Sequence, residues 1–337
     1  MIIEEKAYPR AGLVGNPSDG FYGKTIAFTF TNFSAAITLY ESPRIELVQS
    51  KRDHSRFESV HDLVEDVRLY GYYGGIRLLK ASIKKFHDYC SDRNFDVNGR
   101  NFTVCYDSNI PHLVGLAGSS AIITACMRAM MRFYDVRISK PELANLVLSA
   151  EKDELGISAG LQDRVVQAYQ GVVYMDFAKS HMEKEGFGRY EEIDASLLPP
   201  LYIAYRADLS EVSEVVHNDL TGRFLAGDSK VLDAVDFWAE LTDRVRTKLL
   251  EGKTDDIGSL LDANFDRRAA LYPITRGNQQ MIEAARKTGA SAKFTGSGGA
   301  IVGTYHGEPM FNKLKEEMAR LNTMVVKPRI APAKEEN

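Results

Sequence analysis

Apolar and polar positions along this 337-residue chain follow two periods, and each period predicts a different kind of element. Residues 24–40 and 102–106 are rich in β-branched and aromatic side chains. In the second segment Phe102, Val104 and Tyr106 share one face. Both segments are therefore predicted to be strands.

Helical spacing dominates the segments that follow. Residues 75–89 place their apolar side chains on one side, and residues 121–134 are apolar nearly all round, which predicts a buried helix. A further helix is predicted to begin at Ser139, because Glu142 stands three residues later as in a capping box. This helix is expected to end near Glu151.

The rest of the chain mixes strands and helices without strict alternation, which favours an α+β fold over a doubly wound sheet. Pro199 and Pro200 suggest a junction between a first domain, 1–198, and a second domain, 199–327, and residues 328–337 are predicted to be a mobile tail. Further elements are expected as strands at 171–177, 201–205 and 292–303 and as helices around 211–227, 230–251, 277–288 and 308–321.

Charge and cysteine content narrow the class of protein. With 42 basic and 46 acidic residues the net charge is only −4, so we expect neither nucleic acid nor a membrane as a partner. Cys90, Cys105 and Cys126 are odd in number and lie in apolar contexts, which predicts free thiols in a reducing compartment. The N-terminus lacks the pattern of a signal peptide, and no run approaches ~18 apolar residues. We expect a cytoplasmic protein whose oligomeric state stays open.

The stretch GLAGSSA, residues 115–121, is unusual because it is almost free of large side chains and runs into the apolar segment. A glycine-rich turn ahead of a helix directs free N–H groups and the positive end of the helix dipole at one point, which suits phosphate. The hydroxyls of Ser119 and Ser120 could cap the helix, contact a phosphate oxygen or bind magnesium. The alternative is a tight turn with serine caps ahead of a core helix.

Three motifs in order carry a resemblance to a known family. PHLVGLAGSSA, residues 111–121, is similar to the Pro-x-x-x-Gly-Leu-x-Gly-Ser-Ser-Ala signature of the GHMP kinase superfamily. PRAGLVGNPSD, residues 9–19, resembles the opening motif of that family, with Asn16-Pro17-Ser18 where Glu-His-Thr is common. KFTGSGGAIVG, residues 293–303, resembles its third motif.

This resemblance implies a two-lobed α+β fold, with a first lobe like domain 2 of ribosomal protein S5 and a ferredoxin-like second lobe. It also implies that ATP is the phosphate donor and Mg²⁺ the cofactor. The nucleotide-binding residues that it implies are Pro111, Gly115, Leu116, Ala117, Gly118, Ser119, Ser120, Ala121, Gly296, Ser297 and Gly298.

Residues 149–177 resemble the family's segment in which a Glu on a helix reaches the magnesium ion and a Gly-x-x-Asp turn presents the catalytic Asp. The resemblance implies Glu151 and Ser120 as metal ligands and Asp163 as the group that removes or orients the proton of the attacking hydroxyl. From the residues alone, Glu151 could equally be solvated in the last turn of a helix, and Asp163 could be a helix N-cap.

Two basic residues are further catalytic candidates. Arg10 keeps the spacing of the arginine in the opening motif, and Lys24 follows the same motif. Either cation, placed close to Asp163, could keep that carboxylate ionised and neutralise the transferred phosphoryl group. The sequence does not say which of the two lies nearer.

Within the superfamily the chain is most similar to the plant-type glucuronokinases, in segments 15–26, 71–81, 108–122 and 149–171. That likeness implies phosphorylation of the anomeric hydroxyl of D-glucuronate by ATP, giving glucuronate 1-phosphate and ADP and feeding UDP-glucuronate synthesis. Alternatives are a related kinase acting on a heptose phosphate, galacturonate, galactose or mevalonate, and a sensor of the same fold that transfers no phosphate.

Binding a sugar acid requires side chains that contact its carboxylate, its ring and its hydroxyls. The carboxylate suits an arginine, and Arg77 is the local candidate, although it could equally be a plain surface residue of its helix. Tyr22 and Tyr73 are candidates for stacking on the sugar, and Asn16 and Asp19 for binding its hydroxyls.

Overall fold

The computed structural model describes residues 1–48, 74–97, 99–206 and 214–335, and within these ranges it contains three four-stranded sheets. The first sheet has the order β1 (Ile2–Ala7), β4 (Ala35–Glu41), β6 (Phe102–Ser108), β5 (Glu46–Val48). Its pairs are antiparallel except for β5 on β6. Side chains of β1 alternate between exposed and buried, because one face of this sheet packs on the core.

The second sheet has the order β2 (Arg10–Val14), β3 (Lys24–Thr29), β7 (Val172–Asp176), β8 (Arg189–Ile193) and is antiparallel throughout. A short 3₁₀ helix, η1 (Ser18–Phe21), joins β2 to β3. The single strand predicted at 24–40 is therefore wrong. The chain turns between Thr29 and Ala35, at residues that include Asn32 and Ser34, and enters the other sheet as β4.

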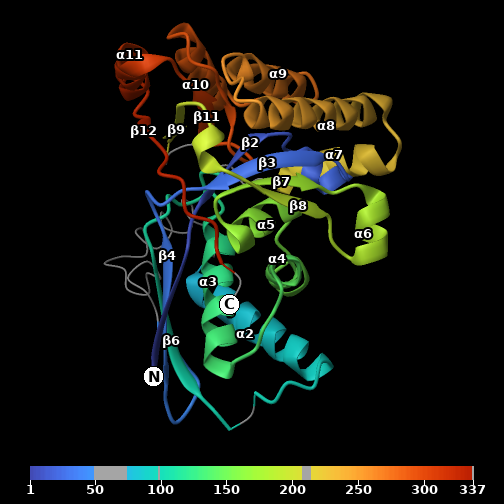
Figure 1. The fold of residues 1–337 in the computed structure, drawn as a ribbon, viewed down its shortest axis with the longest axis vertical. Coiled ribbons are helices and arrows are strands. Elements are labelled where there is room, and N and C mark those ends of the chain that lie inside the picture. The colour runs from blue at the N-terminus through green and yellow to red at the C-terminus, as the bar shows by residue number, and fades with distance from the viewer. Residues whose placement is uncertain (49–73, 98, 207–213, 336–337) are drawn as a thin grey trace, which may run out of the picture.

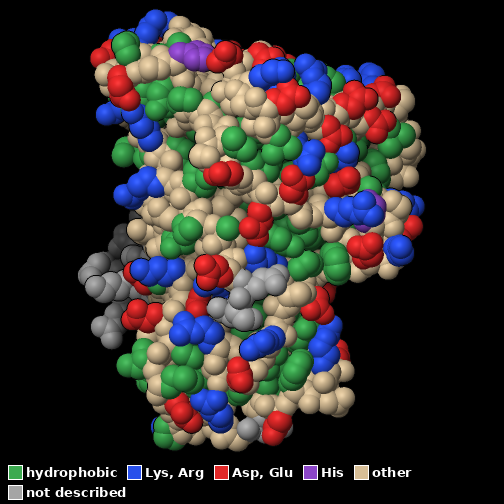
Figure 2. Space-filling view, viewed as in Figure 1, with side chains coloured by type: hydrophobic (Ala, Val, Ile, Leu, Met, Phe, Trp, Pro, Cys, Tyr) green, Lys and Arg blue, Asp and Glu red, His purple; other side chains and the backbone are tan. Residues whose placement is uncertain are grey.

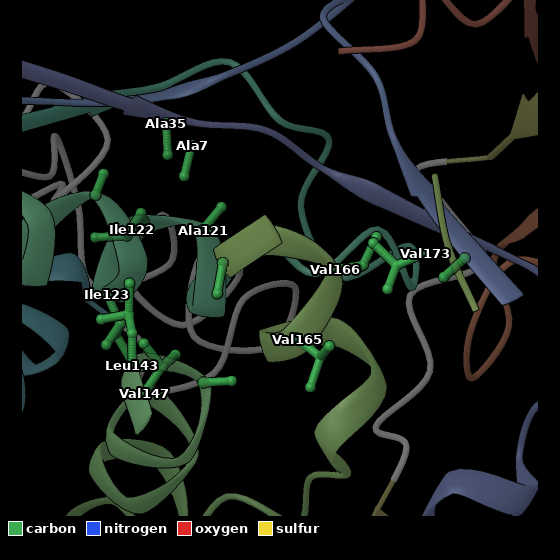
Figure 3. Packing of buried hydrophobic residues seen from close by; sticks show 14 of the residues in the cluster. Ala7, Ala35, Ala121, Ile122, Ile123, Leu143, Val147, Val165, Val166 and Val173 are labelled. Atoms are coloured by element: carbon green, nitrogen blue, oxygen red, sulfur yellow. The ribbon is translucent and has the colours of Figure 1, made fainter. Parts of the chain in front are cut away.

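Within the described ranges the first lobe also contains the helices α2 (Gly75–Asp92), α3 (Gly118–Tyr134), α4 (Lys140–Ser149), α5 (Leu161–Tyr169) and α6 (Lys179–Glu185), of which α3 packs on the first sheet and α5 on the second. The predicted helix at 121–134 is confirmed as α3, which is buried along almost its whole length and packs on β1, β4, α4 and α5 (Figure 1). Figure 3 shows Ile123 of α3 near Leu143 and Val147 of α4. The capping box at the start of α4 is also confirmed.

The third sheet has the order β10 (Lys293–Phe294), β11 (Ala300–Thr304), β9 (Leu201–Tyr205), β12 (Met324–Val326), antiparallel throughout. It forms the second lobe with the helices α7 (Glu214–Leu225), α8 (Ser229–Leu250), α9 (Ile257–Ala269), α10 (Arg276–Lys287) and α11 (Gly307–Ala319), grouped at the top of Figure 1. The strand predicted at 292–303 is wrong as one element, because a glycine turn splits it. Helix α9 was not predicted.

The end of the chain returns to the first lobe. The Ala331 amide donates to the Thr29 carbonyl at 2.9 Å, and the Lys334 amide donates to the Tyr169 carbonyl at 2.7 Å. The mobility predicted for residues 328–337 stays a prediction, although the described part of that segment makes these bonds. The domain boundary at 198/199 also stays a prediction. It lies between β8 of the second sheet and β9, the first strand of the third sheet.

The distribution of charge on the surface and the state of the cysteines agree with the expectations from the composition. Figure 2 shows basic and acidic side chains interspersed over the face that it presents, without a large field of one sign. Cys90, Cys105 and Cys126 are all free thiols, as predicted. Among the residues that the structure describes, no helix has the length and hydrophobicity needed to span a bilayer.

Candidate active site

Two glycine-rich loops, distant in sequence, lie against each other between the lobes. The first leads into α3 and the second joins β10 to β11. Gly115 has φ 68°, and a Cβ atom there would lie 2.6 Å from the carbonyl oxygen of Gly298. The Thr295 hydroxyl donates to the Gly115 carbonyl at 3.1 Å. The contact requires glycine at 115 because of both its backbone angle and the nearness of the other loop.

Gly118 begins α3 and differs from Gly115. Its backbone is not left-handed, and a Cβ atom there would only meet the Ile110 side chain at 3.5 Å, an ordinary contact distance. Neither conformation nor packing within the protein therefore requires glycine at this position. The first N–H groups of an α-helix have no partners within the helix, so this bare helix start is a suitable anion site.

Arg10, on β2, binds Asp163 in the first turn of α5. Its Nε donates to Asp163 Oδ1 at 2.5 Å and its Nη2 to Oδ2 at 2.8 Å, while Nη1 donates to the Gly115 carbonyl at 2.5 Å. One buried guanidinium thus joins the opening motif, the first glycine loop and the catalytic candidate. Of the two basic candidates that the sequence left open, Arg10 is the one that lies beside Asp163.

Lys24 does not share this location. Arg10 pairs with Thr29 across the β2–β3 ladder. Lys24 is five residues from Thr29 on β3, which separates these two residues by roughly 16 Å at the strand rise of about 3.3 Å per residue. Lys24 Nζ instead binds Asp243 of α8 at 2.6 Å and lies 3.8 Å from Asp176. The expectation of Lys24 close to Asp163 is thus corrected.

Glu151 lies in a π turn after α4 and is completely buried, so the alternative of a solvated residue is wrong. It forms an ion pair with Arg164, whose Nε donates to Glu151 Oε2 at 2.6 Å. The Ser119 hydroxyl donates to Glu151 Oε1 at 2.7 Å. Ser120 was the residue predicted to bind the metal ion together with Glu151. Its hydroxyl is instead buried and donates to the Ala117 carbonyl at 3.3 Å. The hydroxyl that contacts Glu151 therefore belongs to Ser119.

A second carboxylate, Asp19 in η1, approaches the start of α5. Its Oδ2 accepts a hydrogen bond from the Gln162 amide at 3.3 Å. A Cβ atom at Gly160 would lie 2.2 Å from the same oxygen, so glycine there allows the approach. Burial and the nearby Asp163 carboxylate raise the pKa of Asp19 to about 6.

The pKa of Asp163 moves the other way. Burial raises it, but the guanidinium groups of Arg10 and Arg164 outweigh burial and bring the pKa of Asp163 below its usual value. Burial lowers the pKa of Arg164, but the carboxylates of Glu151 and Asp163 outweigh burial and raise it, so Arg164 stays protonated. The site thus holds one carboxylate that is firmly ionised and one that titrates near neutrality.

Two buried basic residues in the second lobe were not predicted. Lys293 Nζ donates to the Gly12 carbonyl at 2.7 Å, to Asn16 Oδ1 at 2.5 Å and to the Phe294 carbonyl at 2.7 Å. Arg268 of α9 donates to the carbonyls of the second glycine loop, which positions that loop. Lys293 is the first residue of the third motif, and that position is the one signal that could have indicated its role.

The predicted sugar-binding residues lie in different environments. Asn16 is buried, and its side chain binds Lys293 and the Phe294 carbonyl, so it links the two lobes, and its role in sugar binding stays a prediction. Tyr22 is half exposed, and its ring packs near Phe224 of α7. Arg77 is half-buried in the first turn of α2. Tyr73 lies outside the described residues.

Comparison with known proteins agrees with this geometry. A sequence profile of the GHMP kinases N terminal domain matches residues 77–171. Probable glucuronokinase 2 from Arabidopsis thaliana is 42% identical over 335 residues, which cover 97% of this chain and 91% of that protein. The chain belongs to the GHMP kinases. Like other members it is a phosphotransferase with an alcohol acceptor and uses ATP as a substrate.

Further GHMP kinases resemble it at greater distance. Glucuronokinase 1 from the same plant is 41% identical over 338 residues, covering 98% of this chain and 93% of that protein. The crystal structure of Lactococcus lactis galactokinase complexed with galactose aligns with a TM-score of 0.78 at 15% identity, over 100% of this chain and 95% of that one. This last likeness concerns the fold alone, and it confirms the predicted two-lobed α+β GHMP kinase fold.

Proposed function

We propose that this GHMP kinase transfers the γ-phosphoryl group of ATP to the anomeric hydroxyl of D-glucuronate, giving glucuronate 1-phosphate and ADP. The observation that carries the reaction class is the bidentate Arg10–Asp163 pair, because its guanidinium also touches the glycine loop that opens α3. A phosphate and an acceptor group bound on either side of this pair would be neighbours. The choice of sugar rests on whole-chain similarity to the Arabidopsis glucuronokinases.

The triphosphate is assigned to the bare start of α3 at Gly118 and to the second glycine loop at Gly296–Gly298. Backbone N–H groups at a helix start bind phosphate oxygens without side-chain ordering costs. Arg10 lies under the junction of the loops, since a Cβ atom at Gly296 would meet its Nη2 at 2.8 Å. A fixed positive charge here would stabilise the negative charge that the transferred phosphoryl group gains.

Glu151 and the Ser119 hydroxyl are the proposed Mg²⁺ ligands, with Ser120, the original candidate, one residue further along the helix. Their oxygen donors suit this hard cation, which binds proteins through one or two carboxylates and keeps phosphate oxygens and water in its shell. When bound, the cation neutralises the phosphates.

Asp163 has the proposed role of orienting the acceptor hydroxyl. Two guanidinium groups fix the carboxylate in position, and it lies in the first turn of a packed helix, so little motion accompanies the reaction. Arg77 remains the proposed partner for the uronate carboxylate, and Tyr22 and Tyr73 remain candidates for contact with the sugar ring. Cytoplasmic location and small molecules as the partners likewise stay proposals.

A coupled assay of ADP release tests the proposal. Glucuronate, galacturonate, glucose, galactose and mevalonate are compared as acceptors at saturating ATP and Mg²⁺. We expect glucuronate to have the highest kcat/KM, with galacturonate second and glucose far below both, because glucose lacks the carboxylate. Preference for glucose or mevalonate over glucuronate would contradict the assigned sugar. Absence of ADP release with every acceptor would contradict the proposed reaction as a whole.

A further inference from the structure

The two carboxylate oxygens of Glu151 have different partners. Oε1 accepts one hydrogen bond, from the Ser119 hydroxyl at 2.7 Å. Oε2 accepts from Arg164 Nε at 2.6 Å, and Arg164 Nη2 donates to the same oxygen. A guanidinium group that directs two N–H groups at one carboxylate oxygen engages both of its lone pairs in charge-assisted hydrogen bonds. Within the described contacts, Glu151 therefore keeps a lone pair for a further partner on Oε1 and not on Oε2.

Arg164 is itself fixed by its other contacts. Its Nη1 donates to the Gly160 carbonyl at 2.9 Å and lies 3.2 Å from Asp163 Oδ2. Only 5% of its side chain is exposed, so water does not replace these bonds. A guanidinium group is planar and rigid, and here all three of its nitrogens have protein partners. Arg164 therefore closes the Oε2 side of Glu151.

The Oε1 side of Glu151 leads toward the first glycine loop. Glu151 has no exposed surface of its own, but Ser119, which binds Oε1, is partly exposed. Ser119 is the second residue of α3 and directly follows Gly118, where the triphosphate is assigned. A cation carried by that triphosphate would therefore reach Glu151 at Oε1, in company with the Ser119 hydroxyl oxygen.

The number of available oxygens matters because divalent cations differ in size. Mg²⁺ binds proteins through one or two carboxylates together with phosphate oxygens and water, whereas Ca²⁺ takes six to eight oxygens and often binds both oxygens of one carboxylate. We propose that Arg164 restricts Glu151 to one oxygen for the metal ion and thereby makes the site select Mg²⁺ over Ca²⁺. Arg164 is then a positioning residue that acts through Glu151. The assignment rests on the proposed function, with Glu151 and Ser119 as the metal ligands.

The test is calorimetric titration with a non-hydrolysable ATP analogue, once at saturating Mg²⁺ and once at saturating Ca²⁺. The measured quantity is the ratio of the two dissociation constants, Ca²⁺ over Mg²⁺, and the wild type is expected to give at least about 10. Arg164→Met is close in length but has no N–H group, so it frees Oε2. Because removing the partner of a metal ligand weakens metal binding by about 10- to 100-fold, the Mg²⁺ complex should weaken by that factor. The Ca²⁺ complex gains a second oxygen, so the ratio should fall about tenfold or more.

Two control variants separate metal selection from a structural role. Arg164→Lys retains a positively charged donor for Oε2 and is expected to keep the ratio within about threefold of the wild type. Arg246→Met makes the same chemical change in a partly exposed ion pair with Glu191 and is expected to leave the ratio unchanged. General damage to the fold would weaken the Mg²⁺ and Ca²⁺ complexes alike, so only a change in their ratio supports the proposed role of Arg164.

A crystal structure of the wild type with Ca²⁺ and the analogue decides the matter even if Arg164→Met folds poorly. We expect the ion on Oε1 of Glu151 and on the Ser119 hydroxyl, with Oε2 still bound to Arg164. An ion bound to both carboxylate oxygens would overturn the assignment.

The outcomes also separate this assignment from the proposed function. Neither measurement uses a sugar or turnover, so an error in the acceptor does not affect them. An analogue that binds with both ions and gives the wild-type ratio in Arg164→Met would overturn the role of Arg164 alone. An analogue that binds with neither ion in the wild type would contradict the proposed function and, with it, this assignment.

Discussion

Gly118→Ala tests why the loop before α3 lacks side chains. A methyl group at this position would meet only the Ile110 side chain, at 3.5 Å, and the backbone there is one that alanine adopts freely. Replacing glycine by alanine in a helix stabilises a protein by about 0.5–1 kcal/mol. If a triphosphate binds against this backbone, however, the methyl group occupies its space, and we expect ATP affinity to fall at least tenfold, about 1.4 kcal/mol.

Gly115→Ala is the matched change three residues earlier. Its left-handed backbone costs alanine about 1–2 kcal/mol, and its Cβ would lie 2.6 Å from the Gly298 carbonyl oxygen, so the second loop must move at a further cost of about 1–3 kcal/mol. We therefore expect the free energy of unfolding to fall by about 2–5 kcal/mol. The two variants separate glycine required by the fold from glycine required by a ligand.

The assays are urea unfolding of both variants without ligand and calorimetric titration with a non-hydrolysable ATP analogue. Gly118→Ala should be as stable as the wild type or slightly more stable, and should bind the analogue weakly. The reasoning is refuted if Gly118→Ala binds the analogue as tightly as the wild type, or if it is destabilised as much as Gly115→Ala.

Three further outcomes follow from the charges of the site. Asp163→Asn should keep its affinity for the ATP analogue and lose at least about 10²-fold in kcat, and full turnover in this variant would refute its role in orienting the hydroxyl. Asp19→Asn should be more stable than the wild type by about 2–3 kcal/mol at pH 7, because the pKa of Asp19 is 3.8 for the free group and about 6 in the folded protein. The folded wild type binds that proton more tightly, so its stability recovers as the pH falls from 6 to 3.8, and urea unfolding across this range should show the gap closing. Lys293→Met removes the donor shared by the Gly12 carbonyl and Asn16, and should lower the free energy of unfolding by about 2–4 kcal/mol, which thermal and urea unfolding would detect.

Much of the site was predictable because its parts are local in sequence. The loop at 115–121, the buried helix after it and the Gly-x-x-Asp turn at Asp163 each form within a few residues, so their spacing predicts their structure. The spacing of the opening motif made Arg10 a candidate, but the choice between Arg10 and Lys24 as the neighbour of Asp163 needed the structure. The helix at 257–269 was missed although its apolar residues recur at helical spacing.

The remaining features depend on contacts between distant parts of the chain. Lys293 binds Gly12 across 281 residues, and no periodicity in a single sequence predicts such a partner. Lys24 was misplaced because its motif indicates proximity to the site, while the antiparallel register carries it to the far end of the strand. Arg164 follows Asp163 directly, but its role depends on the turn that buries Glu151 beside it.

The most direct test of the account is a crystal structure with a non-hydrolysable ATP analogue, Mg²⁺ and glucuronate. We expect the triphosphate on the backbone between Gly115 and Ala121, the metal ion on Glu151 and Ser119, and the anomeric hydroxyl within hydrogen-bond distance of both Asp163 and Asp19. A nucleotide bound away from Gly118, or a sugar remote from Asp163, would contradict it.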